Sequence, residues 1–168
     1  MKFLNVKMIG LRGKHHPAIA NIKTIQEVAK MRPHLKMLCG NLLTYGTKFE
    51  QDGLGSPHCR LCGSEFESVS HVVATCCQFN EIRMKILSEY DDLLKTSKNN
   101  LRISIFMQSE NKLAQFLLDP TSMNLEERIH LNDPIVTEAY KLSRDICSAI
   151  SKQRMNKLNE MQEKKKKC

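Results

Sequence analysis

Apolar residues recur three or four positions apart along most of the chain, and this spacing predicts amphipathic helices. A first helix is expected between residues 19 and 31. Pro33 predicts the first turn of a second helix, because the residue before a proline is disfavoured in the α region and proline is tolerated at the first helical position. This second helix should bury Leu35 and Leu38. The apolar stripe predicted to face inward on the first helix is Ile22, Ile25, Val28 and Ala29.

The second half of the chain continues the helical pattern. Residues 98–118 predict one or two helices, and Asp119-Pro120 and Asp133-Pro134 are both helix-start signals, an acidic N-cap followed by proline. From Pro134 a long helix should run toward Lys157. We therefore predict a mainly α fold, a small helical domain with a long C-terminal helix. The helix after the central segment carries the stripe Phe79, Ile82, Ile86, Leu87, Tyr90, Leu93 and Leu94.

The central segment, HCRLCGSEFESVSHVVATCC, contains Cys59, Cys62, His71 and Cys76 at the spacing C-x2-C-x8-H-x4-C. Three thiolates and an imidazole are the ligands that tetrahedral zinc prefers, and structural sites use four protein ligands. We predict a closed, knuckle-like CCHC site for one structural Zn²⁺, around which the domain is built.

The residues between the ligands suit this geometry. Gly63 can adopt the positive φ that a turn after the second cysteine requires, and such a turn can direct backbone N–H groups at the sulfurs. His71 should then open a short helix. Residues 71 and 76 would lie about 140° apart on an ideal α-helix, so this helix should end before Cys76. The predicted helix-start residues are Glu65, Glu67, Ser68 and Ser70.

Several alternatives remain open in the sequence. Cys77 could replace Cys76 as the fourth ligand, and His58 is a weaker substitute because Cys59 beside it already supplies that ligand. Buried free thiols beside a core histidine would be the simplest non-metal interpretation. His15 and His16 are typical of a polar loop.

Composition narrows the class of protein. The 168 residues contain 5% aromatics and no tryptophan, which suits helices packed by aliphatic side chains. Seven cysteines, without a secretory signal or an apolar run of about 18 residues, favour a reducing compartment. We expect an intracellular protein of the nucleus or cytoplasm that does not associate with membranes.

The two flanking segments of the chain are basic, whereas the central segment is slightly acidic. Residues 1–58 carry nine basic and three acidic side chains, 59–97 four and six, and 98–168 thirteen and nine. Contact with RNA or DNA would therefore come from the basic flanks. The predicted organisation is a flexible basic arm (1–18), N-terminal helices and linker (19–57), the zinc segment (58–78), a helical region (79–163) and a basic tail (164–168).

The run from residue 32 to 83 resembles the zinc-binding tail that follows the polymerase domain of LINE-type (non-LTR) retrotransposon reverse transcriptases. The resemblance lies in LKMLCG, SPHCRLCG, ESVSH and the exit Cys76, Phe79 and Arg83, and it extends to FLLDPTSMNLEERI and LSRDICSAI. It implies a detached C-terminal fragment, a non-catalytic zinc-binding module that assists RNA or DNA binding. The sequence departs from the family at Cys77, where a residue that is not a ligand is common.

Two other functions compete with this one. A zinc-stabilised protein–protein interaction module would use the C-terminal helix to dock a partner. A metal-dependent nuclease remnant would need carboxylates and a lysine on adjacent strands, and the nearest candidates, Asp119 and residues 126–128, lie in turn and helix sequence. Tyr90-Asp91-Asp92 is interpreted as a solvated helix face. We predict no catalytic residues.

Overall fold

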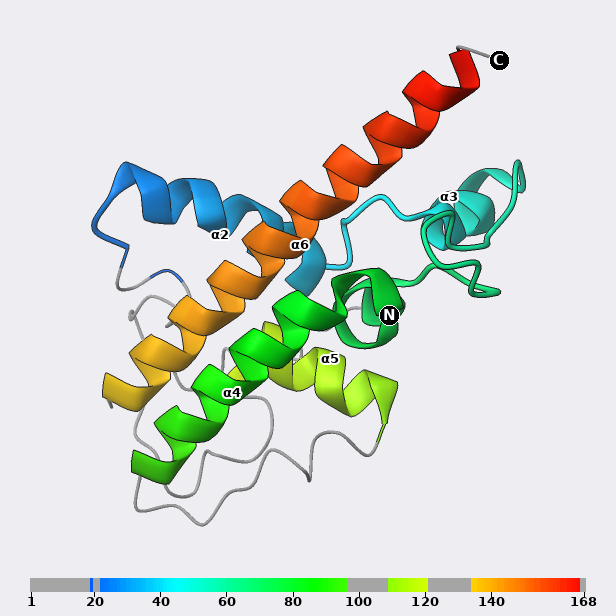
Figure 1. The fold of residues 1–168 in the computed structure, drawn as a ribbon. Helices are drawn as coiled ribbons and strands as arrows, with labels where there is room; N and C mark the ends of the chain where they lie inside the picture. The colour runs from blue at the N-terminus through cyan, green and yellow to red at the C-terminus, as the bar shows by residue number, and fades with distance from the viewer. Residues whose placement is uncertain (1–18, 20–21, 97–108, 121–133, 167–168) are drawn as a thin grey trace.

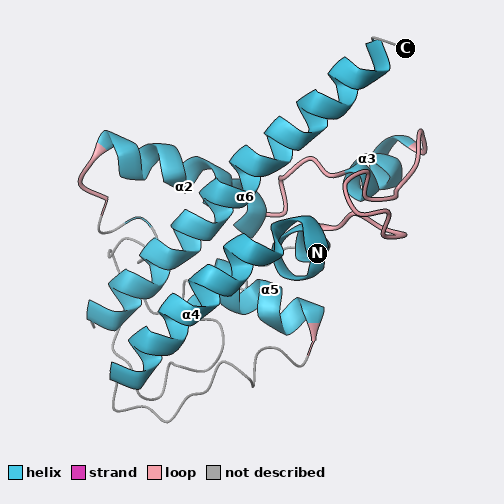
Figure 2. Ribbon diagram, viewed as in Figure 1, coloured by secondary structure: helices cyan, strands magenta, loops and turns pink. Residues whose placement is uncertain are grey.

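The computed structural model describes residues 19, 22–96, 109–120 and 134–166, and every regular element in these ranges is a helix (Figure 2). The predicted mainly α fold with a long C-terminal helix is confirmed. The elements are α2 (Ile25–Leu38), α3 (Tyr45–Asp52), the π turn η2 (His71–Thr75), the 3-10 turn η3 (Cys77–Phe79), α4 (Asn80–Thr96), α5 (Glu110–Leu118) and α6 (Pro134–Lys166).

The long helix α6 organises the others. It begins at Pro134, as the Asp-Pro signal predicts, and continues past Lys157 to Lys166. Figure 1 shows it crossing the whole molecule, and α2, α4, α5 and η2 all pack against it. Its contact face combines small and branched side chains with one tyrosine and two arginines. The buried residues of this face are Val136, Ala139, Tyr140, Ser143, Arg144, Ile146, Cys147, Ile150 and Arg154.

Helix α2 corrects two predictions. It is one continuous helix with Pro33 inside it, not two helices separated there. The predicted inward stripe is also wrong, because Ile25 is 88% and Val28 50% exposed. The half after Pro33 is the packed half: it buries Met37 and Leu38 among α5 and α6. We infer that this packing outweighs the cost of about 3 kcal/mol that a proline imposes in a helix interior.

Helix α4 follows the predicted pattern. Ile86, Leu87 and Leu94 are buried along one face, together with Tyr90. The Tyr90 hydroxyl lies 2.7 Å from the Ala139 carbonyl oxygen, to which it donates, and its ring centroid lies 4.7 Å from that of Phe116 on α5. The aromatic side chain thus joins α4 to both neighbouring helices.

The acidic residues beside Tyr90 lie on the outer face of α4. The Lys95 ammonium contacts the carboxylates of Asp91 at 2.6 Å and Asp92 at 3.4 Å, and Lys95 and Asp92 are exposed. The prediction of a solvated helix face is therefore confirmed for Asp92 and wrong for Tyr90, which is buried in the same helix.

The helix start predicted at Asp119-Pro120 comes directly after α5, and Pro120 adopts a 3-10 conformation there. Asp119 is the C-cap that ends α5, and its buried carboxylate accepts a hydrogen bond from the Tyr140 hydroxyl of α6. This contact joins the end of α5 to a residue of α6 that is 21 positions away, and the local sequence of Asp119 does not indicate it. The segment that follows Pro120 lies outside the described residues.

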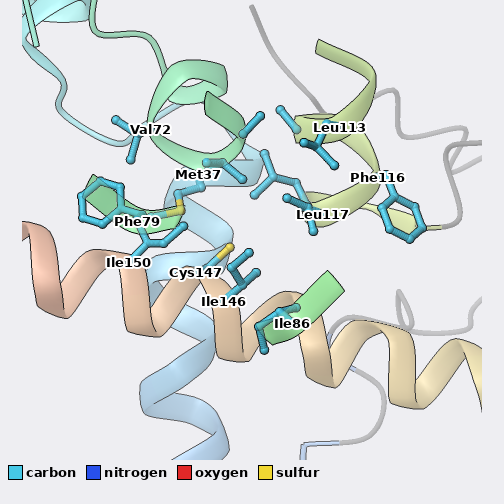
Figure 3. Packing of buried hydrophobic residues seen from close by; sticks show 14 of the residues in the cluster. Met37, Val72, Phe79, Ile86, Leu113, Phe116, Leu117, Ile146, Cys147 and Ile150 are labelled. Carbon is cyan, nitrogen blue, oxygen red and sulfur yellow. The ribbon is translucent and has the colours of Figure 1, made fainter. Parts of the chain in front are cut away.

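The core lies where the central segment meets α2, α5 and α6. Figure 3 shows Met37, Val72 and Phe79 converging with Cys147 and Ile150 of α6. Burial raises the pKa of the Cys147 thiol, so this side chain remains neutral and packs as a small apolar group. The predicted zinc segment is thus part of the hydrophobic core.

Candidate metal centre

The structure brings Cys59, Cys62, His71 and Cys76 together, and we call these four residues the Cys3His cluster. Their ligand atoms all lie within 4.8 Å of one another. The Sγ atoms of Cys59 and Cys76 are 4.0 Å apart, and Cys62 Sγ lies 3.2 Å from His71 Nε2. A tetrahedral zinc with sulfur ligands at about 2.3 Å requires sulfur–sulfur distances of about 3.8 Å. The cluster is therefore close to the dimensions of a four-ligand metal site, and it could bind a metal ion.

The first two ligands lie in a tight loop, the knuckle turn (residues 59–64). Its closure comes from two backbone hydrogen bonds, from Gly63 N–H to the Cys59 carbonyl at 2.7 Å and from Cys59 N–H to the Ser64 carbonyl at 2.9 Å. Gly63 has φ +80°, in the left-handed region that favours glycine. The fold of this turn agrees with the positive φ predicted at Gly63.

Backbone N–H groups point at the cysteine sulfurs, as the turn predicts. The hydrogen bond with Cys76 is the largest influence: it lowers the pKa of the Cys59 thiol and raises that of Cys76, while burial raises the pKa of Cys62. The backbone N–H groups of Cys62 and Leu61 lower the pKa of Cys59 further. Donors of this kind stabilise thiolate, the form of cysteine that binds metals.

The other two ligands are separated by a π turn, which sequence reasoning did not anticipate. The Cys76 N–H donates to the His71 carbonyl at 2.7 Å, an i→i+5 bond. An α-helix would set these two residues about 140° apart, whereas an i→i+5 turn returns residues five apart to nearly the same side. The helical turn also ends before Cys76, as predicted, because Cys76 has ψ 117°.

Glu67 has a different role from the predicted one. Its side chain is fully buried, and its carboxylate accepts a hydrogen bond from the Tyr45 N–H at 2.6 Å, so it caps α3 and not the helical turn of His71. The Arg154 guanidinium of α6 binds both of its oxygens, at 3.3 and 3.0 Å. Glu67 thereby joins α3 to α6 beside the cluster, 3.7 Å from Cys59 Sγ. No sequence signal indicates this pairing, because 87 residues separate the partners.

Arg83 is a second buried arginine beside the cluster, 3% exposed. It donates to the carbonyls of Val73 at 2.9 Å and Cys76 at 2.8 Å, and to the Asn80 side chain at 3.3 Å. Among the described residues, no carboxylate lies within ion-pair distance of it. A divalent ion held by three thiolates and a neutral imidazole carries about one net negative charge, which Arg83 would complement.

The alternative ligands lie outside the cluster. Cys77 is exposed, and its sulfur faces the Gln78 amide at 3.9 Å. His58 is also exposed, and its Nδ1 lies 2.7 Å from the Ser56 hydroxyl. His15, His16 and residues 126–128, which belong to the nuclease candidates together with Asp119, fall outside the described residues.

No protein-family model, curated protein or solved structure matches this chain. None of the described helices combines the length and the apolar character needed to cross a lipid bilayer. The functional interpretation therefore depends on the chemistry of the cluster and of the surfaces around it.

Proposed function

We propose that this chain is a non-catalytic zinc-binding module, in which the Cys3His cluster holds one structural Zn²⁺. The observation that carries the proposal is the convergence of four ligand atoms within 4.8 Å, three of them thiol sulfurs. Thiolate and imidazole donors at tetrahedral spacing favour zinc over the oxygen-preferring ions magnesium and calcium.

A structural role follows from the number of donors. Four protein ligands complete a tetrahedron, whereas catalytic zinc sites keep one position for water or substrate. Two of the ligand residues, Cys59 and Cys76, are at most 1% exposed. The ion would join the surface knuckle turn to the buried π turn, and its binding energy would stabilise the fold.

Zinc quantification on protein purified under reducing conditions tests this proposal. We expect one zinc per chain, retained in Cys77→Ser and lost in Cys76→Ser. These two variants are matched controls, because they make the same change in adjacent residues. Zinc loss in Cys77→Ser with retention in Cys76→Ser would move the fourth ligand by one residue.

We further propose that the module assists RNA or DNA binding, as the resemblance to retrotransposon tails implies. Two surface features favour this role. Near α3, the Arg60 guanidinium lies 4.3 Å above the Tyr45 ring, and Phe49 and Phe66 are 38% and 39% exposed, so rings and a cation are available for base stacking. At the end of α6, exposed lysines offer contacts to phosphates.

The salt dependence of binding tests the nucleic-acid role. Replacing Lys164–Lys167 with glutamine should weaken RNA and DNA binding and lower the salt slope by about 0.7–0.9 for each phosphate contact removed. A control that replaces four exposed lysines elsewhere removes the same charge: Lys85, Lys112, Lys141 and Lys152. Equal affinities and slopes in wild type and the tail variant would contradict a role for this tail.

A protein-docking role is the second candidate. Its support is the C-terminal part of α6, which extends beyond the other helices in Figure 1 and leaves Met155 53% exposed. A hydrophobic interface would persist at high salt, whereas phosphate contacts would weaken. Binding of a partner protein that survives 1 M salt, with no measurable affinity for RNA or DNA, would favour docking.

A further inference from the structure

A chain of hydrogen bonds leads away from the cluster through its histidine. The Nδ1 atom of His71 lies 3.2 Å from the Thr75 hydroxyl oxygen, and that hydroxyl donates to the Glu110 carboxylate at 2.8 Å. His71 and Thr75 are four residues apart in the π turn, while Glu110 is the first residue of α5. We call these three residues the histidine relay.

The donor and acceptor roles in the relay follow from hydroxyl chemistry. A threonine hydroxyl has one hydrogen and two lone pairs, and the Glu110 carboxylate can only accept. The Glu110 oxygen lies 2.8 Å from the Thr75 hydroxyl and the His71 carbonyl oxygen lies 3.5 Å from it, so the hydrogen points to the nearer Glu110. A lone pair then faces His71, which must carry its proton on Nδ1. The other ring nitrogen, Nε2, is then free of hydrogen and faces Cys62 Sγ at 3.2 Å. This is the tautomer that a metal ligand at Nε2 requires.

A second contact fixes the same turn from the same helix. The Ser70 hydroxyl donates to the Asn111 side chain at 3.0 Å, and Asn111 follows Glu110 in the first turn of α5. Helix α5 and the π turn also pack closely through buried apolar side chains. The position of His71 is therefore coupled to the start of α5, and not only to its own segment.

We propose that Thr75 and Glu110 are positioning residues for the metal ligand His71. The relay holds the imidazole in its Nδ1–H form and directs Nε2 at the ion, so that it increases metal affinity and slows metal release. This inference rests on the proposed zinc site. Hydrogen-bond partners of metal-ligating histidines typically change metal affinity about 10–100-fold when they are removed.

Paired substitutions test the relay. Thr75→Val removes the hydroxyl at nearly constant shape, and Glu110→Ala removes the acceptor, so each should weaken zinc binding about 10-fold or more in competition with a chromophoric chelator. Thr75→Ser and Glu110→Gln keep a hydroxyl and an acceptor oxygen, and should restore affinity close to that of wild type. Glu81→Ala, at an exposed acidic residue in the first turn of α4, is the matched control and should leave affinity unchanged.

Nitrogen-15 spectra of the zinc-loaded wild-type protein report the tautomer without any substitution. We expect His71 with its proton on Nδ1 and the metal on Nε2. The opposite tautomer, or unchanged affinity and metal release in both Thr75→Val and Glu110→Ala, would overturn the relay while leaving the zinc site intact. A wild-type protein that binds no zinc would instead overturn the proposed function itself.

Discussion

The two halves of the Cys3His cluster differ in what surrounds them. The half with Cys59 and Cys62 lies in the knuckle turn, where Arg60 and Gly63 are exposed and Cys62 is only partly buried, while the Cys59 side chain itself is buried. The half with His71 and Cys76 lies in the core, where Val72 and Val73 between them are fully buried. One pair of ligands is therefore supported by a surface loop, and the other by the packed interior of the fold.

This difference indicates what the metal contributes. Apolar contacts with α4, α5 and α6 stabilise the π turn, so its position depends little on an ion. The knuckle turn belongs to the α3 lobe (residues 44–67), and Figure 1 shows α3 at the edge of the molecule. A bound ion would cross-link this lobe to the core. Without the ion, the Glu67–Arg154 ion pair still joins the lobe to α6, and Cys59 and Leu61 pack against the core.

The largest expected effect comes from removing the knuckle ligands. Cys59→Ser or Cys62→Ser should abolish stoichiometric zinc, and with it about 10 kcal/mol of the binding energy that is also folding energy at structural zinc sites. We expect limited proteolysis to begin within residues 53–67 while circular dichroism retains most of the helix signal. Stoichiometric zinc in both variants would contradict the assignment of the cluster.

A smaller loss of stability is expected from breaking the buried ion pair between Glu67 and Arg154. Glu67→Gln leaves the Arg154 charge buried without its carboxylate partner, which typically costs about 3–5 kcal/mol. Urea unfolding of the zinc-loaded protein measures the change in free energy. The double variant Glu67→Gln, Arg154→Met should recover part of the loss, because it removes the uncompensated charge as well. A loss below about 1 kcal/mol in the single variant would show that the pair contributes little.

Gly46→Ala should destabilise the junction of α3 with the knuckle segment. An added Cβ would lie 2.7 Å from the Glu67 carbonyl oxygen and 2.6 Å from the Phe66 ring. Overpacking of this kind costs about 1–3 kcal/mol, whereas glycine to alanine inside a helix ordinarily stabilises it by about 0.5–1 kcal/mol. The sign of the change in unfolding free energy is the test, with Ser88→Ala on the exposed face of α4 as a control. A stabilised Gly46→Ala protein would mean that α3 and the Glu67 backbone are not in close contact.

The smallest effect concerns the first half of α2. Ile25→Ala and Val28→Ala should change stability by less than about 0.5 kcal/mol, because both side chains are exposed. Met37→Ala in the packed half should cost about 2–5 kcal/mol. Losses of stability of similar size in the two halves would contradict this difference and would support the inward-facing stripe that the sequence pattern predicts.

Sequence reasoning succeeded where a local pattern determines the structure. The apolar period of α4 and the Asp-Pro signal before α6 each lie within one element, and they predicted buried faces and a helix start correctly. The ligand spacing likewise grouped four residues that the fold brings together. Such features depend on neighbours in the chain, so the sequence contains their signal.

The features that sequence reasoning missed depend on distant residues. The partner of Glu67 is Arg154, and the partner of Thr75 is Glu110, 35 residues away, so no spacing rule links either pair. The continuity of α2 through Pro33 also reflects packing against other helices, which overrides a local preference. The π turn is the remaining case. The five-residue separation of His71 and Cys76 excluded an unbroken α-helix between these two ligands. It did not indicate that an i→i+5 hydrogen bond would form there instead.

Hydrogen exchange with and without zinc tests most directly the claim that the ion cross-links the knuckle turn to a core that is packed without it. After chelation under reducing conditions, amides of residues 45–67 should lose most of their protection, while those of α4 and the buried part of α6 keep theirs. Equal loss of protection in both regions would contradict this account, because the core would then depend on the ion as much as the α3 lobe does. Unchanged exchange in the α3 lobe would contradict it as well, since the lobe would then be held without any metal.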